Sequence, residues 1–222
     1  MKPAPPTPID EKRAELGGPR WDPAWDKIVE EALPPEMLSA QVARDVRPFC
    51  PRFNLLDEAD KRAFWAYLFQ ALAAAEAGLK PTSHVRHAQP EMQVKDEVSG
   101  AQGRTEGLLQ LTYADQKRYD CDFDWESDRK LRAGDPARTI LQPKNNLECG
   151  VKIMEQELIA QHKGLLSRTQ YWSTLQPGTV SYRVFAKQMA NVPEACGVRK
   201  RTERKTKPRH IETASTSSAA AP

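Results

Sequence analysis

The sequence lacks the long apolar runs that membrane insertion requires. Its 222 residues contain no stretch of about 18 apolar residues, and the first residues show no apolar core of a signal peptide. Alternating β-branched runs, which would indicate strands, are also scarce. Apolar residues instead recur at helical spacing between proline and glycine breaks. These patterns predict a soluble, mainly helical protein without a membrane span.

The chain has little excess charge of either sign, because its net charge is only +3. The excess is concentrated in residues 199–222, which hold seven basic and two acidic residues and leave the rest of the chain at −2. This segment has almost no apolar side chain to bury, so we expect it to be disordered. Its charge alone does not indicate a nucleic-acid function, and no nucleic-acid partner is expected.

Cysteines are few and widely separated, at Cys50, Cys121, Cys149 and Cys196. Their spacing excludes the short paired motifs of a zinc site. An even number permits two disulfides in any of three pairings, which would fit an oxidising compartment, and four free thiols are the alternative. His84 and His87 have no evident third ligand, so we expect neither a metal nor a cofactor.

Three regions follow from composition. Residues 1–21 are rich in proline and are expected to form a flexible arm, residues 22–195 one all-α domain, and residues 196–222 a disordered basic tail. Shorter helices are expected near residues 24–32, 36–46, 112–118, 168–175 and 181–190. Residues 80–103 are polar and aperiodic, and a loop of that length within a domain tends to be functional or mobile.

Two helices are predicted most clearly. The first begins after Asp57, a good N-cap, and ends at Gly78 and Pro81, with Phe64 and its i+4 successors forming an apolar stripe. The second lies within residues 142–162. Gly150 inside it costs about 1 kcal/mol relative to alanine, which predicts the close approach of another helix or of a ligand.

Glu76 continues the apolar face of the first helix and lies near its C-terminal end. Burial and the negative pole of the helix dipole both disfavour ionisation of a carboxyl there. We therefore expect a raised pKa, as a general acid needs at neutral pH. A glutamate that simply reaches solvent at a helix end is the alternative.

The order of segments after Glu76 resembles the motif series of the lysozyme-like lytic transglycosylases of the soluble (SLT) type. In that family a helix ends in Glu-Ser with an aromatic or apolar residue, Asn and Pro soon after. The chain has Glu76, Leu79, Lys80 and Pro81 in these places. The family's Gly-Leu-Met-Gln is matched by the segment Gly107, Leu108, Leu109 and Gln110.

Two later motifs extend the resemblance over about residues 64–175. Asn146, Leu147 and Gly150 are similar to the family's asparagine, apolar residue and glycine at a helix start, and Tyr171 best matches a tyrosine that lies against the catalytic carboxyl. The chain departs from the family at Ala77, where the family has serine, in the longer loop after Glu76, and around Tyr171, which lacks the usual Ala-Tyr-Asn-Ala-Gly.

The resemblance implies a lysozyme-like helical domain that cleaves the β-1,4 bond between N-acetylmuramic acid and N-acetylglucosamine in peptidoglycan. Glu76 would act first as acid and then as base, without a metal. The resemblance and the local sequence give five candidate substrate-binding residues: Gln110, Glu106, Tyr113, Asn146 and Tyr171. Glycan strands would be the partner of a monomeric protein in the periplasm or outside the cell.

Two alternatives remain open at this point. Glu106 or Asp115 could lie across the cleft from Glu76 and activate water, which would make the enzyme a hydrolytic muramidase. Against this, Glu106 is at least as well explained as a carboxylate that pairs with backbone N–H groups or an arginine, and Asp115 as a surface residue. A peptidoglycan-binding module with weak or no activity is the second alternative.

Overall fold

The structure, a computed structural model, describes residues 5–87 and 94–197 and is mostly helical. Its α-helices are α1 (Pro8–Leu16), α2 (Pro23–Ala32), α3 (Ala43–Val46), α4 (Glu58–Ala77), α5 (Asp115–Tyr119), α6 (Trp125–Asp128), α7 (Pro143–Glu155) and α8 (Val180–Gln188). Short 3-10 helices lie at Pro35–Leu38, Phe53–Leu55, Thr139–Leu141, Ser173–Leu175, Met189–Asn191 and Glu194–Cys196. The prediction of a mainly helical protein is confirmed.

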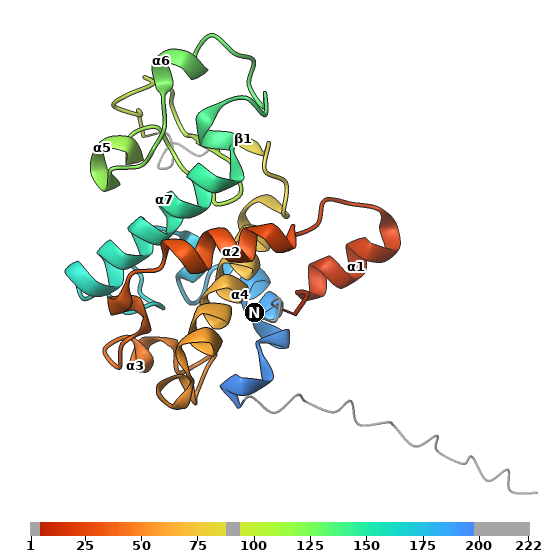
Figure 1. The fold of residues 1–222 in the computed structure, drawn as a ribbon. Coiled ribbons are helices and arrows are strands. Elements are labelled where there is room, and N and C mark those ends of the chain that lie inside the picture. The colour runs from red at the N-terminus through yellow and green to blue at the C-terminus, as the bar shows by residue number, and fades with distance from the viewer. Residues whose placement is uncertain (1–4, 88–93, 198–222) are drawn as a thin grey trace, which may run out of the picture.

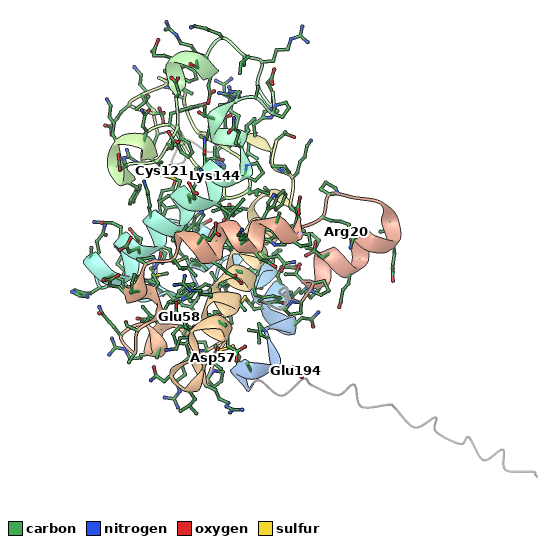
Figure 2. The ribbon with its side chains drawn as sticks, in the orientation of Figure 1. Arg20, Asp57, Glu58, Cys121, Lys144 and Glu194 are labelled. Carbon is green, nitrogen blue, oxygen red and sulfur yellow. A yellow bond between two sulfur atoms is a disulfide. The ribbon has the colours of Figure 1, made fainter. Side chains whose placement is uncertain are left out.

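Helix α4 is the centre of the fold, and its ends are those predicted. The Asp57 carboxylate (Figure 2) accepts a hydrogen bond from the Asp60 N–H at 2.8 Å, and Gly78 ends the helix at φ 56°. Every residue from Phe64 to Ala74 is buried, so this part of the helix is enclosed on all sides rather than along one stripe. Helices α2 and α8 pack against it (Figure 1).

Helix α7 confirms the expectation of a close approach at Gly150. A Cβ atom there would lie 2.1 Å from Leu109 Cδ1 and 3.3 Å from Phe69 Cε1. The neighbours are therefore α4 and the turn before α5. Helix α2 lies across α7 as well as α4 (Figure 1), and a π-helical turn at Gln156–Ala160 continues the chain beyond α7.

The shorter helices agree with the sequence only in part. Those expected at 24–32 and 181–190 are α2 and α8. The one expected at 36–46 is divided into Pro35–Leu38 and α3, because the Ser39 hydroxyl bonds the Glu36 carbonyl at 2.7 Å and accepts from the Gln41 N–H. The helix expected at 112–118 begins only at Asp115, and 168–175 contains only Ser173–Leu175.

The chain after α4 contains strands that its sequence did not indicate. Strands β1 (His84–Arg86) and β2 (Arg104–Glu106) pair antiparallel, with His84 opposite Glu106 and Arg86 opposite Arg104. Each is three residues long, too short for a period of two to be recognised. Together with α5 and α6 they form one end of the molecule, at the top of Figure 1, away from α1 and α3.

The N-terminal region is not the flexible arm that its composition suggested. It contains α1, and buried Asp10 accepts hydrogen bonds from Trp21 N at 2.9 Å, from the Thr7 hydroxyl at 2.8 Å and from the Gln70 amide of α4. A polar anchor of this kind leaves no apolar periodicity in the sequence. Residues 7–21 are therefore part of the folded body.

Two disulfides decide among the pairings that the sequence left open: Cys50–Cys196 and Cys121–Cys149. They suggest an extracellular or periplasmic protein. Cys196 is fully buried, so the folded body extends beyond the predicted boundary at residue 195, whereas the tail from residue 198 lies outside the described residues. Within the described ranges no helix is long and apolar enough to cross a bilayer.

Candidate active site

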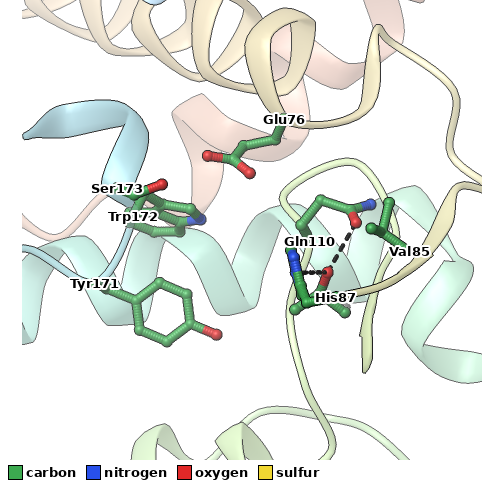
Figure 3. A pocket seen from close by; sticks show the side chains of 8 residues that line it. Glu76, Val85, His87, Gln110, Tyr171, Trp172 and Ser173 are labelled. Atoms are coloured by element: carbon green, nitrogen blue, oxygen red, sulfur yellow. Dashed lines mark hydrogen bonds between the residues drawn. The ribbon is translucent and has the colours of Figure 1, made fainter. Parts of the chain in front are cut away.

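A cleft of about 350 Å³ opens between the end of α4, the β1–β2 hairpin and the segment that leads into Ser173–Leu175 (Figure 3). Three separate stretches of chain therefore form its walls. We call it the Glu76 cleft. Its lining residues are Glu76, Val85, His87, Thr105, Gln110, Tyr171, Trp172 and Ser173.

Glu76 lies in the last turn of α4, and its carboxyl group points into the cleft (Figure 3). Burial raises the pKa of this carboxyl to about 7, against the opposing effect of a hydrogen bond from the Thr174 hydroxyl to Oε1. At neutral pH about half of the molecules then carry a protonated Glu76. Ala77 stands where the resemblance expects serine, and Thr174 supplies a hydrogen bond to the acid from another part of the chain.

Asn146, which is fully buried, holds the turn after β2 from its core side. Its Oδ1 accepts from the Leu109 N–H at 2.9 Å, and its Nδ2 donates to the carbonyls of Glu106 at 3.3 Å and Ile140 at 3.0 Å. Gly107 has φ 83°, and a Cβ there would lie 2.1 Å from Asn146 Nδ2. Asn146 therefore shapes the turn rather than binding a ligand, which corrects its assignment as a cleft residue.

The turn places Gln110 on the cleft wall while the leucines around it face the core. Leu108, Leu109 and Leu111 are fully buried. Glu106 and Leu111 exchange two backbone hydrogen bonds of 2.8 Å across the turn. Gln110 takes a left-handed conformation at φ 53°, which costs a residue other than glycine of the order of 1 kcal/mol. The surrounding structure maintains this conformation and directs the Gln110 side chain into the cleft.

The Gln110 amide is held at both ends. Its Nε2 donates to the Gly107 carbonyl at 2.8 Å, and its Oε1 accepts from the Thr105 hydroxyl at 2.9 Å. Because the Thr105 proton is directed at Gln110, the His87 Nε2 atom at 3.3 Å acts as a donor to the Thr105 oxygen. One amide proton and one carbonyl lone pair of Gln110 remain for a ligand.

Tyr171 lines the opposite wall, and its hydroxyl donates to Asp115 Oδ2 at 2.6 Å. Asp115 is fully buried and also accepts from the Thr112 N–H and hydroxyl. Burial raises its pKa, and the Tyr171 hydrogen bond opposes this most. The expectation that Asp115 lies at the surface is therefore wrong. With its proton committed to Asp115, the Tyr171 oxygen can only accept hydrogen bonds from a ligand.

Glu106 and Tyr113, two further predicted substrate residues, lie in a buried network behind the sheet. Glu106 is 2% exposed and forms ion pairs with Arg138 and, at 2.8 Å, with Arg104 Nε. Burial raises its pKa while the two arginines oppose this. The Tyr113 hydroxyl donates to Asp128 Oδ2 and accepts from Arg138 Nη2, both at 2.8 Å. Neither residue lines the Glu76 cleft.

The structure thus brings together three of the predicted residues, Glu76, Gln110 and Tyr171, and separates the other three from the cleft. Among the described residues that line it, Glu76 carries the only carboxyl group. His87, Thr105 and Thr174 are site residues that the sequence did not identify, because they belong to short elements without periodicity. No three potential metal ligands gather anywhere in residues 5–87 and 94–197.

No family model and no curated protein matches the chain. Solved structures of a protein called DslA (Bd0314) are similar in fold. The wild type, in a structure described as form 2, is 21% identical, with a TM-score of 0.63 over 88% of this chain and all of that one. One glutamate-to-glutamine variant is 20% identical, with a TM-score of 0.61 over 86% of this chain and 98% of that one. A second such variant is 21% identical, with a TM-score of 0.63 over 88% of this chain and all of that one. At this identity the likeness shows the fold alone.

Proposed function

We propose that the protein is a lytic transglycosylase that cleaves the β-1,4 bond between N-acetylmuramic acid and N-acetylglucosamine in peptidoglycan. The observation that carries the proposal is Glu76, whose pKa of about 7 keeps a protonated carboxyl available at neutral pH in an open cleft. The mainly helical fold and the order of the motifs support a lysozyme-like domain of the SLT type.

One carboxyl can perform both proton transfers of this reaction. Protonated Glu76 gives its proton to the glycosidic oxygen as the bond from that oxygen to C1 of the muramic acid breaks. The resulting carboxylate then takes the proton of the C6 hydroxyl as O6 bonds to C1, which closes a 1,6-anhydro ring. No water is consumed, and Glu76 returns to its protonated state.

The cleft walls offer suitable partners for an N-acetylated sugar. Gln110 keeps one donor and one acceptor free, and the Tyr171 oxygen accepts. An acetamido group, with one N–H and one carbonyl, matches this set. The neighbouring indole of Trp172 is fixed by its 2.8 Å hydrogen bond to the Leu109 carbonyl, so this wall is rigid before a strand arrives.

The structure offers less support for a hydrolytic muramidase, which needs a second carboxylate that activates water. Glu106 is engaged by two arginines, and Asp115 is fully buried and bonded to Tyr171. Neither can activate a water molecule in the cleft without breaking these contacts. The disulfides fit a protein that acts where peptidoglycan lies, in the periplasm or outside the cell.

The test is digestion of purified peptidoglycan by the wild type, by Glu76→Gln and by Glu31→Gln. Glu31 is an exposed glutamate on α2, 3.5 Å from Lys27, and provides a matched control. We expect loss of at least a hundredfold in rate for Glu76→Gln and none for the control. Equal digestion by all three proteins would refute the role of Glu76.

Mass spectrometry of the products separates the remaining functions. Anhydro-muramic ends are expected, whereas reducing ends would show a hydrolytic muramidase. Tight binding to sacculi without release of any product by the wild type would show a binding module instead.

A further inference from the structure

A second hollow, of about 180 Å³, adjoins the Glu76 cleft and shares His87 (Figure 3) and Thr105 with it. It lies between the hairpin, the segment that follows Val94 and the start of α5. Three of its lining side chains carry positive charge, namely Lys95, Arg104 and Arg118. We call it the basic hollow.

Among the described residues that line it, Asp96 carries the only carboxyl group, and that group is directed into the protein. Asp96 is 8% exposed, and its Oδ1 accepts from the N–H groups of Val98 and Ser99 and from the Ser99 hydroxyl. Its Oδ2 accepts from the Ala114 N–H at 2.7 Å. These contacts fix the loop and occupy both carboxylate oxygens, and Asp96 forms no ion pair with a cation of the hollow within the described part of the chain.

Two of the three cations, Lys95 and Arg118, retain capacity for an anion. Lys95 is exposed and takes part in no ion pair among the described residues. Arg104 uses Nε for Glu106, and its Nη2, which has no hydrogen-bond partner within the described part of the chain, is itself buried, so Arg104 adds positive charge rather than a donor. Arg118 bonds Glu97 at 2.9 Å, but both side chains are exposed, and such pairs contribute little and exchange readily.

We propose that the basic hollow is a subsite for a carboxylate carried by the strand bound in the Glu76 cleft. This inference rests on the proposed function, and it names the substituent that is recognised. Muramic acid bears a lactyl group at C3, which ends either in a free carboxylate or in a stem peptide with its own carboxylates. Because the hollow and the cleft share a wall, a sugar held near Glu76 can direct this substituent toward Lys95 and Arg118.

The test measures binding of three ligands to the full chain with Glu76→Gln, which prevents turnover. The ligands are strands with stem peptides, strands freed of peptides that expose the lactyl carboxylate, and N-acetylglucosamine oligomers without a carboxylate. Binding is compared with and without Lys95→Gln plus Arg118→Gln. The matched control, Lys117→Gln plus Arg129→Gln, removes two exposed charges outside the hollow.

We expect the paired change in the hollow to weaken binding of at least one carboxylate-bearing strand roughly tenfold and to leave the neutral oligomers unaffected. The strand that loses affinity identifies the lactyl or the peptide carboxylate. The control pair should alter no affinity by more than about twofold. Equal losses for neutral oligomers, or no loss for either charged strand, would overturn the subsite.

Cleavage by the chain with Glu76 intact separates the two proposals. Anhydro products together with unchanged affinity in the hollow variant would refute the subsite and leave the transglycosylase standing. Selective loss of carboxylate binding without any cleavage would refute the enzyme and keep the subsite. Absence of both binding and cleavage would overturn both.

Discussion

Replacing Glu76 by glutamine is expected to stabilise the folded protein at alkaline pH and to leave its stability at acidic pH nearly unchanged. The wild-type carboxyl has a pKa of about 7 in the folded state, against 4.5 as its ordinary value. The folded protein therefore holds the Glu76 proton more tightly than the unfolded chain does. The contribution of this proton to the stability of the folded state is complete below pH 4.5 and is lost as the pH rises through 7.

The magnitude follows from the two pKa values. A difference of one pKa unit corresponds to about 1.4 kcal/mol, so the ionised carboxylate costs the folded state about 3 kcal/mol above pH 7. Glutamine has nearly the same shape, can still accept the Thr174 hydrogen bond and never ionises. The advantage of the variant should therefore grow from near zero at pH 4 to about 3 kcal/mol at pH 8.

The assay is urea unfolding of the wild type and of Glu76→Gln at pH 4, 6 and 8. In a thermal melt at pH 8, the same difference should raise the Tm of the variant by roughly 6 to 12 °C for a domain of this size. Glu31→Gln, at an exposed position, should show no such trend. A stability difference that stays constant between pH 4 and pH 8 would refute the raised pKa of Glu76.

Three further outcomes follow from the site. The rate of strand cleavage should fall about tenfold per pH unit above pH 7 as Glu76 loses its proton, whereas a flat profile to pH 9 would contradict its role as acid. Glu106→Gln should lower the free energy of unfolding by about 3 to 5 kcal/mol, because it leaves buried Arg138 without its counter-charge, and product analysis of the folded fraction should still give anhydro ends. Asp115→Asn and Tyr171→Phe should each reduce kcat/KM roughly tenfold or more, and kinetics of the double variant should show no additional loss because the two residues act as one unit. Losses that simply add would show that Asp115 does not act through Tyr171.

Local signals explain what the sequence predicted well. The ends of α4 depend on Asp57 and Gly78, which act on their own turns. The position of Glu76 at the end of that helix follows directly from its spacing. Gly150 predicted a close contact because a glycine in a helix interior needs compensation, and Leu109 with Phe69 provides it.

Longer-range contacts explain what the sequence did not predict. Asp115 appears polar and exposed in its own segment, and its burial depends on Tyr171, 56 residues away. The local sequence for Tyr113 and the motif position for Asn146 gave the correct neighbourhood, but they could not tell which side of the turn each residue would occupy. The Thr174 hydroxyl reaches Glu76 across 98 residues, a contact that no local pattern contains.

The Cys50–Cys196 disulfide joins residues 146 positions apart and so closes most of the folded body into one covalent ring. A protease that cuts once between these two cysteines would leave both fragments attached to each other. Under non-reducing conditions the nicked and the intact protein should have the same mass to within one added water. Among proteases the protein would thereby keep the α4 end and the Tyr171 wall in a single molecule after a first cut.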